Sequence, residues 1–138
     1  MTETREWTFE NSTLRFEPPD VFWARFQGTL TLKDARASMA VYEELSEVRP
    51  FFFVAEMGGS VRLDPEAARY LSENVPGSWM RAQIYISTRL LHRALVKGLT
   101  LAAHLTWSAE EHPFEKIHHV STEADARALI ARIRAQGA

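Results

Sequence analysis

The sequence predicts an α/β fold on one mixed sheet, with antiparallel N-terminal strands followed by α-β-α-β-α-β-α crossovers. The first thirty residues alternate apolar and polar side chains with the period of two that is typical of strands. After Gly28 the apolar spacing changes to three and four, which indicates a helix that packs on a core. The remaining chain alternates apolar runs with helix-start residues, and crossovers of this length predict parallel strands.

Three short apolar groups near the N-terminus predict a β-meander. Turn residues separate the groups, with Asn11 and Ser12 after the first and a Pro-Pro-Asp run at 18–20 after the second. Residues 1–12 are expected to supply an extra edge strand or a partly disordered tail. The apolar positions are Trp7 and Phe9, Leu14 and Phe16, and Phe22, Ala24 and Phe26.

A helix is predicted to begin after Thr31 and to end before Pro50. Thr31 and Asp34 have the spacing of a capping box, with aspartate in place of the usual glutamate. Residues three and four positions apart share one face of a helix, so they identify the side that packs on the core. The apolar positions with this spacing are Leu32, Ala35, Met39, Tyr42, Leu45 and Val48.

The rest of the chain alternates strands and helices, and capping residues mark the helix starts. Candidate caps are Asp64 before Pro65, Ser87 or Thr88, and Thr122 with Asp125. The predicted elements are strand 51–57, helix 65–74, strand 81–86, helix 89–106, strand 114–120 and a helix after Thr122. That last helix carries Leu129, Ile130 and Ile133 on its apolar side, and Arg127, Arg132 and Arg134 are expected to form a solvated face.

Length and composition restrict the class of protein. A chain of 138 residues with 46% hydrophobic and 25% charged residues is typical of one globular domain, here spanning 1–138. The net charge of −2 disfavours a nucleic-acid partner, because such proteins present a basic face. Cysteine is absent, which excludes a disulfide framework. With neither an apolar leader nor an apolar run long enough to span a bilayer, we expect a cytoplasmic protein without membrane insertion.

The order of elements resembles the STAS-like superfamily, and its SpoIIAA-like branch in particular. The resemblance rests on the opening hairpin, the helix after Thr31, the apolar strand that leads to the Asp64 cap, and the run Val-Ser-Thr-Glu-Ala-Asp-Ala-Arg at 120–127. It implies a non-enzymatic regulatory or protein-binding domain in bacterial signalling, without a cofactor. The fold is also similar to lipid-binding Sec14-like proteins, which implies the alternative of a carrier or sensor of a small apolar ligand.

Asp64 is the residue most relevant to that resemblance. Anti-sigma-factor antagonists of this superfamily carry a phosphorylated serine at the start of the corresponding helix. The segment 61–66 contains no hydroxyl residue here, and Ser60 lies about four positions too early. Asp64 is therefore either a fixed negative charge at the switch position or simply the cap of its helix, and the cap is the commoner role.

Loops at the carboxyl ends of the predicted parallel strands form the candidate binding site. The loops 28–31, 58–63 and 87–89 each lead into a helix start, where free amides and two arginines would hold a small anion or a partner's carboxylate. In the alternative, the capping side chains already satisfy those amides and the arginines are solvated. The candidate binding residues are Ser60, Arg62, Asp64, Thr88 and Arg89.

Catalytic and metal-binding patterns are weak. The five histidines lack metal-ligand spacing, and the adjacent His118 and His119 should point to opposite faces of a strand. A Gly-x-Ser-x-Gly nucleophile motif is absent, and Gly58-Gly59-Ser60 lacks the lysine of a phosphate loop. We therefore predict no catalytic residues, no metal and no cofactor.

The predicted helix 89–106 is apolar on more than one side. Such a helix is buried in a core or covered by something else, such as a partner protein, a second copy in a homodimer, or a lipid-like ligand. Aromatic residues near its ends would extend the same patch, because they are enriched at interfaces. The candidate interface residues are Leu101, Leu105, Trp107 and Trp79.

Overall fold

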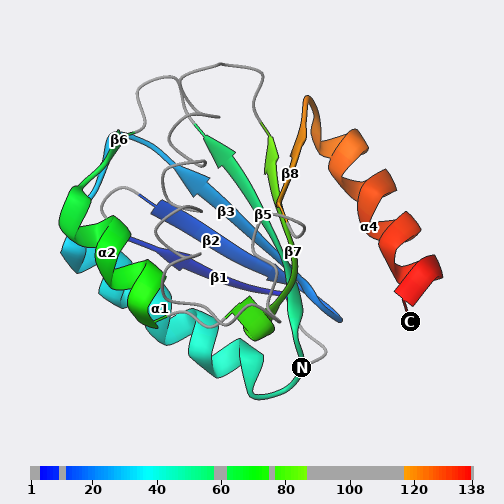
Figure 1. The fold of residues 1–138 in the computed structure, drawn as a ribbon, viewed down its shortest axis with the longest axis horizontal. Helices are drawn as coiled ribbons and strands as arrows, with labels where there is room; N and C mark the ends of the chain where they lie inside the picture. The colour runs from blue at the N-terminus through cyan, green and yellow to red at the C-terminus, as the bar shows by residue number, and fades with distance from the viewer. Residues whose placement is uncertain (1–3, 10–11, 58–61, 75–76, 87–116, 138) are drawn as a thin grey trace.

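A six-stranded mixed sheet forms the centre of the fold (Figure 1). The computed structural model describes residues 4–9, 12–57, 62–74, 77–86 and 117–137. In spatial order the strands are β1 (Arg5–Thr8), β2 (Ser12–Glu17), β3 (Val21–Phe26), β5 (Phe51–Met57), β7 (Met80–Ile86) and β8 (Ile117–Val120). The pairs β1–β2 and β2–β3 are antiparallel, whereas β3, β5, β7 and β8 are parallel. The predicted mixed sheet is therefore confirmed, with β1 as the extra edge strand.

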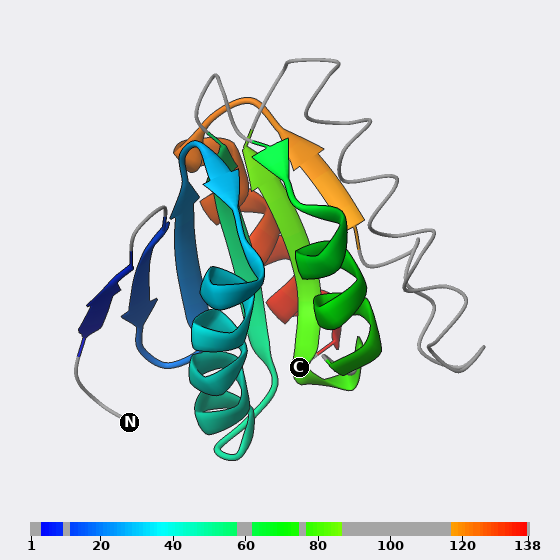
Figure 2. The ribbon, with the colours of Figure 1, turned by 90° about the vertical axis from the view of Figure 1, so that its left-hand side faces the viewer.

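Helices cover both faces of this sheet (Figure 2). Helices α1 (Leu32–Ser46) and α2 (Pro65–Asn74) lie side by side on one face, and α4 (Glu123–Gly137) lies on the other. A short 3-10 helix, η1 (Gly77–Trp79), precedes β7. The predicted helix 89–106 lies outside the described residues.

Helix α1 begins as the sequence predicts and ends earlier. Thr31 and Asp34 form the capping box, since each side chain bonds to the other residue's backbone N–H. The helix stops at Ser46, so Val48 leaves the helical period and its residue surface is 56% exposed. The prediction that Val48 joins the apolar stripe is therefore wrong.

Aromatic rings fill the core on the α1 side of the sheet. Phe22 has no exposed surface, and its ring lies 5.2 Å from Tyr42 in an edge-to-face contact and 5.6 Å from Phe51. Tyr42 comes from α1, while Phe22 and Phe51 come from neighbouring strands. Offset and edge-to-face ring pairs stabilise a core beyond the area that they bury.

A second apolar cluster lies between the sheet and α4. Side chains alternate along a strand, so Val21 and Trp23 point to the α4 side while Phe22 points to α1. The strand residues of this cluster are Val21, Trp23, Phe52, Val54, Ala82 and Ile84, and α4 contributes Ala126, Leu129 and Ile130. The two clusters thus lie on opposite faces of the same sheet.

A two-stranded parallel pair lies outside the main sheet. It joins β4 (Thr29–Leu30) to β6 (Arg62–Leu63). The Arg62 N–H donates to the Gly28 carbonyl at 2.8 Å, and the Asp64 N–H donates to the Leu30 carbonyl at 3.1 Å. Gly28 has a positive φ of 65°, which glycine adopts without steric cost. Two-residue strands have no period to detect, so the sequence did not predict them.

Candidate functional site

The loops after β3 and β5 meet at one edge of the sheet. Because β3 and β5 are parallel, their carboxyl ends lie together, and the β4–β6 pair then ties the two loops to each other. We call the surface formed by Gly28–Thr31 and Arg62–Asp64 the carboxyl edge. Of the candidate binding residues, Arg62 and Asp64 both lie at this edge, and their role in binding stays a prediction. Ser60, Thr88 and Arg89 lie outside the described residues.

Asp64 caps helix α2. Its side-chain Oδ1 accepts a hydrogen bond from the Glu66 N–H at 3.1 Å, and its carbonyl accepts from the Ala68 N–H at 3.0 Å. An aspartate at this position satisfies a backbone donor that the helix itself cannot satisfy. The predicted cap is therefore confirmed, and its carboxylate is held in place by the helix that it starts.

A side chain also satisfies a backbone N–H group at the start of α1. The Asp34 N–H donates to Thr31 Oγ1 at 3.3 Å, and the Thr31 hydroxyl donates to Asp34 Oδ2 at 3.1 Å. Asp34 is only 2% exposed, so its carboxylate is buried within the folded protein. A free anion would meet a carboxylate at each of these two helix starts. This arrangement favours the interpretation in which capping side chains satisfy the amides.

Charged side chains surround these capped helix starts. Arg62 on β6 and Lys33 on the first turn of α1 are exposed, as is Glu66 on the first turn of α2. Arg36, one helical turn further along α1, places its guanidinium over the Tyr70 ring of α2 at 5.6 Å. Exposed charges of both signs on a rigid support suit recognition of a complementary protein surface.

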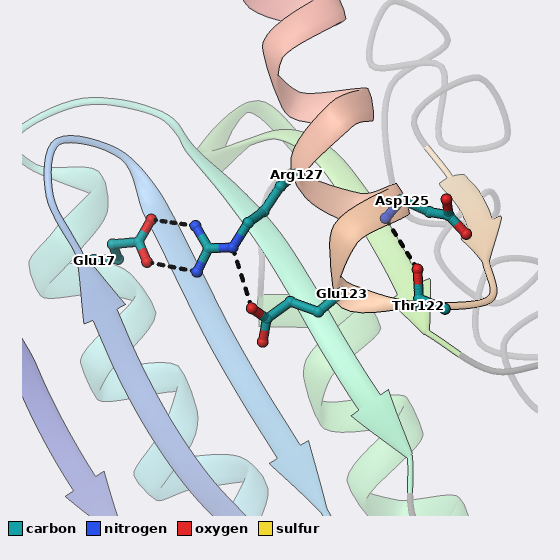
Figure 3. Close-up of polar contacts among 5 residues, drawn as sticks. All are labelled: Glu17, Thr122, Glu123, Asp125 and Arg127. Carbon is teal, nitrogen blue, oxygen red and sulfur yellow. Dashed lines mark hydrogen bonds and ion pairs between the residues drawn. The ribbon is translucent and has the colours of Figure 1, made fainter.

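Arginines of α4 are anchored on the opposite face, where the sequence predicted a solvated face. Arg127 binds Glu17 with both ends of its guanidinium, through Nη1 at 3.0 Å and Nη2 at 2.9 Å, while its Nε donates to Glu123 at 3.2 Å (Figure 3). The hydrogen bonds from Arg127 lower the pKa of Glu17, against the opposing effect of partial burial. The same guanidinium lies over the Trp23 ring at 4.6 Å. The Arg127 side chain is still 44% exposed, so it lies on a solvated face as predicted, but it is paired there with two carboxylates that were not predicted.

Asp20 forms a second anchor near the β2–β3 turn. It is 5% exposed and accepts from Arg81 at 3.5 Å and from Arg134 of α4. Both guanidiniums also lie over the Phe52 ring, that of Arg81 at 4.7 Å and that of Arg134 at 5.5 Å from its centroid. Arg134 is thus anchored as well. The spacing of Glu123 and Arg127 is a local signal for their ion pair, whereas Glu17 and Asp20 lie more than a hundred residues away from the α4 arginines that they bind.

The remaining predicted residues have separate locations. Trp79 in η1 is partly buried and packs against the α1-side core, while Leu101, Leu105 and Trp107 lie outside the described residues. His118 pairs in register with Ile84, and His119 lies 5.9 Å from the Tyr85 ring, so the two histidines point to opposite faces as predicted. Within the described part of the chain, no group of three His, Asp or Glu side chains could hold a metal ion.

No helix among residues 4–9, 12–57, 62–74, 77–86 and 117–137 is long and apolar enough to cross a membrane. No model of a known protein family matches the chain, and neither does any curated protein or solved structure.

Proposed function

We propose that this chain is a non-enzymatic, STAS-like regulatory domain of bacterial signalling that binds a partner protein through its carboxyl edge. The observation that carries the proposal is the β4–β6 pair, which fixes two loops from different parts of the chain as one surface. A surface that is already ordered loses little conformational entropy when a partner binds. Arg62 would supply an exposed cation on this surface, and Asp64 an anion.

Asp64 would act in this proposal as a permanent negative charge. The resemblance to anti-sigma-factor antagonists assigns a phosphorylated serine to the start of this helix. Asp64 has a carboxylate there, held by its bond to the Glu66 N–H. The helix dipole stabilises an anion at this end by about 0.3–1 kcal/mol. A fixed charge at this position would not be switched by phosphorylation.

Removing the Asp64 side chain is expected to lower the free energy of unfolding. Asp64→Ala should cost about 0.5–2 kcal/mol, because the Glu66 N–H loses its acceptor. Asp64→Asn and Asp64→Ser should recover most of that loss, since both supply a side-chain oxygen. Urea denaturation of the four proteins measures the differences, and an unchanged midpoint for Asp64→Ala would show that the cap contributes nothing.

The same Asp64→Asn variant tests the proposed function, because it keeps the cap and removes the charge. We expect a partner protein that wild-type chain retains from lysate of its source organism to be lost with Asp64→Asn and weakened with Arg62→Ala. Glu43→Gln is the matched control, since Glu43 is an exposed acid on α1 outside the carboxyl edge. Titration calorimetry with the purified partner then measures each affinity. Equal binding by all variants would contradict the proposal.

Native mass spectrometry of freshly purified chain separates this proposal from the alternative of an apolar-ligand carrier. For a domain that binds a partner through its carboxyl edge, we expect to detect only the mass of the chain or of its homodimer. A retained lipid-like mass that organic solvent removes would support the carrier instead.

A further inference from the structure

A groove of about 530 Å³ lies between strand β8 and helix α4. All four residues of β8 line it, and α4 contributes Asp125, Ala128, Leu129 and Arg132. These helix positions are spaced by three and four, so they share one face of α4. None of the carboxyl-edge residues lines this groove, so it forms a separate surface.

Opposite charges occupy the two ends of the groove. Helix α4 follows β8 after a short turn and runs back along the sheet (Figure 1), which places Asp125 near the turn. Arg132 lies seven positions further along the helix, about 10 Å away at the rise of an α-helix. His118 lies on the β8 side, and the positive charge of Arg132 is close enough to affect its titration. One end is thus cationic and the other acidic.

Arg132 differs from the other arginines of α4 in its contacts. Arg127 and Arg134 each pair with a carboxylate of the β2–β3 region. Arg132 is exposed, and in the described part of the chain it forms no ion pair. Partial burial lowers the pKa of His118, and the charge of Arg132 lowers it further. Among the residues that the structure describes, neither Arg132 nor His118 forms an ion pair with a carboxylate.

We propose that this groove binds a small organic anion that carries one carboxylate or phosphate group and an apolar body. The anionic group lies between His118 and Arg132, where a guanidinium and an imidazole both donate hydrogen bonds to oxygen. The apolar body contacts Val120, Ala128 and Leu129 of the groove wall. Asp125 repels a second anionic group at the far end, so the site selects ligands that are charged at one end.

Titration of the full chain with sodium hexanoate at constant ionic strength tests the site, with the His118 ring protons followed by NMR. We expect a saturable shift of those protons and a higher pKa of His118 in the complex, because the bound carboxylate stabilises the imidazolium. Hexanoate should bind more tightly than acetate, since only hexanoate reaches the apolar wall. Adipate, which carries a second carboxylate, should bind more weakly than hexanoate because of Asp125.

Arg132→Gln should weaken hexanoate binding about tenfold or more and should raise the pKa of His118 in the free protein. Lys33→Gln is the matched control, because it removes an exposed cation on the opposite face of the sheet. His118→Gln should weaken binding and abolish its pH dependence. Thermal unfolding of each variant confirms that the fold is intact, which is expected at two side chains that are not buried.

The pH dependence of binding has a definite sign. Among the described residues, Asp125, Arg132 and the titratable His119 share the groove with His118, and the neighbour of His118 on β7 is the apolar Ile84. Protonated His118 favours the anion, so affinity should be highest where His118 is protonated and the ligand is still ionised, and it should fall as the pH rises through the pKa of His118 in the complex.

Inorganic phosphate serves as the second probe and identifies the anionic group. Tighter binding of phosphate than of acetate would assign a phosphate ligand, and the reverse order a carboxylate ligand; both support the site. The absence of a saturable shift with hexanoate and phosphate alike would overturn it. Equal affinity of the wild-type chain and Arg132→Gln would also overturn it, because the guanidinium would then have no part in binding.

Discussion

Replacing Phe22 by alanine is expected to lower the free energy of unfolding by about 3–5 kcal/mol. Phe22 has no exposed surface and contacts rings from three directions, Trp7 on β1, Tyr42 on α1 and Phe51 on β5. Truncation removes the transfer free energy of the ring and leaves a cavity that these strands cannot close without losing register. Urea denaturation followed by far-UV circular dichroism measures the change.

Two further variants show that this loss comes from the cavity. Phe22→Leu should cost less than Phe22→Ala, because leucine fills part of the same space. Val48→Ala removes apolar atoms at a position that is 56% exposed, and it should change stability by less than about 0.5 kcal/mol. A cost below about 1 kcal/mol for Phe22→Ala would contradict the central position of this ring in the core.

Replacing Asp20 by alanine is expected to cost about 3 kcal/mol, near the lower end of the range for breaking a buried ion pair. Asp20 is 5% exposed and accepts from both Arg81 and Arg134, so its loss leaves two guanidiniums without their carboxylate. The arginine side chains are 25% and 40% exposed and can regain water, which limits the cost. Urea denaturation again measures the difference from wild type.

A double-mutant cycle isolates the contact between Asp20 and α4. Asp20→Asn with Arg134→Gln should give a coupling energy of about 0.5–3 kcal/mol, because the two side chains share one ion pair. Glu123→Gln is the control, since its exposed pair with Arg127 should be worth less than about 1 kcal/mol. Equal losses for Asp20→Ala and Glu123→Gln would show that burial adds nothing to the Asp20 contacts.

The helix caps, including those at the candidate site, were predictable because their bonds are local. Thr31 with Asp34, Asp64 with Glu66, and Thr122 with Asp125 form the predicted caps, the last with a bond of 3.1 Å (Figure 3). Each bond joins residues two or three positions apart, so residue type and spacing are enough to predict it. The gathering of Arg62 and Asp64 at one edge was also predictable, because parallel strands end on the same side of a sheet.

By itself, the sequence determined the type and order of the described α-helices and of the strands of the main sheet, because alternation along strands and three-to-four spacing along helices depend only on neighbouring residues. The tertiary structure alone decided the contacts between distant segments. Arg127 meets Glu17 across 110 residues, β4 meets β6, and Arg132 shares a groove with His118. These partners leave no local pattern, since they are brought together only when helices pack on the finished sheet.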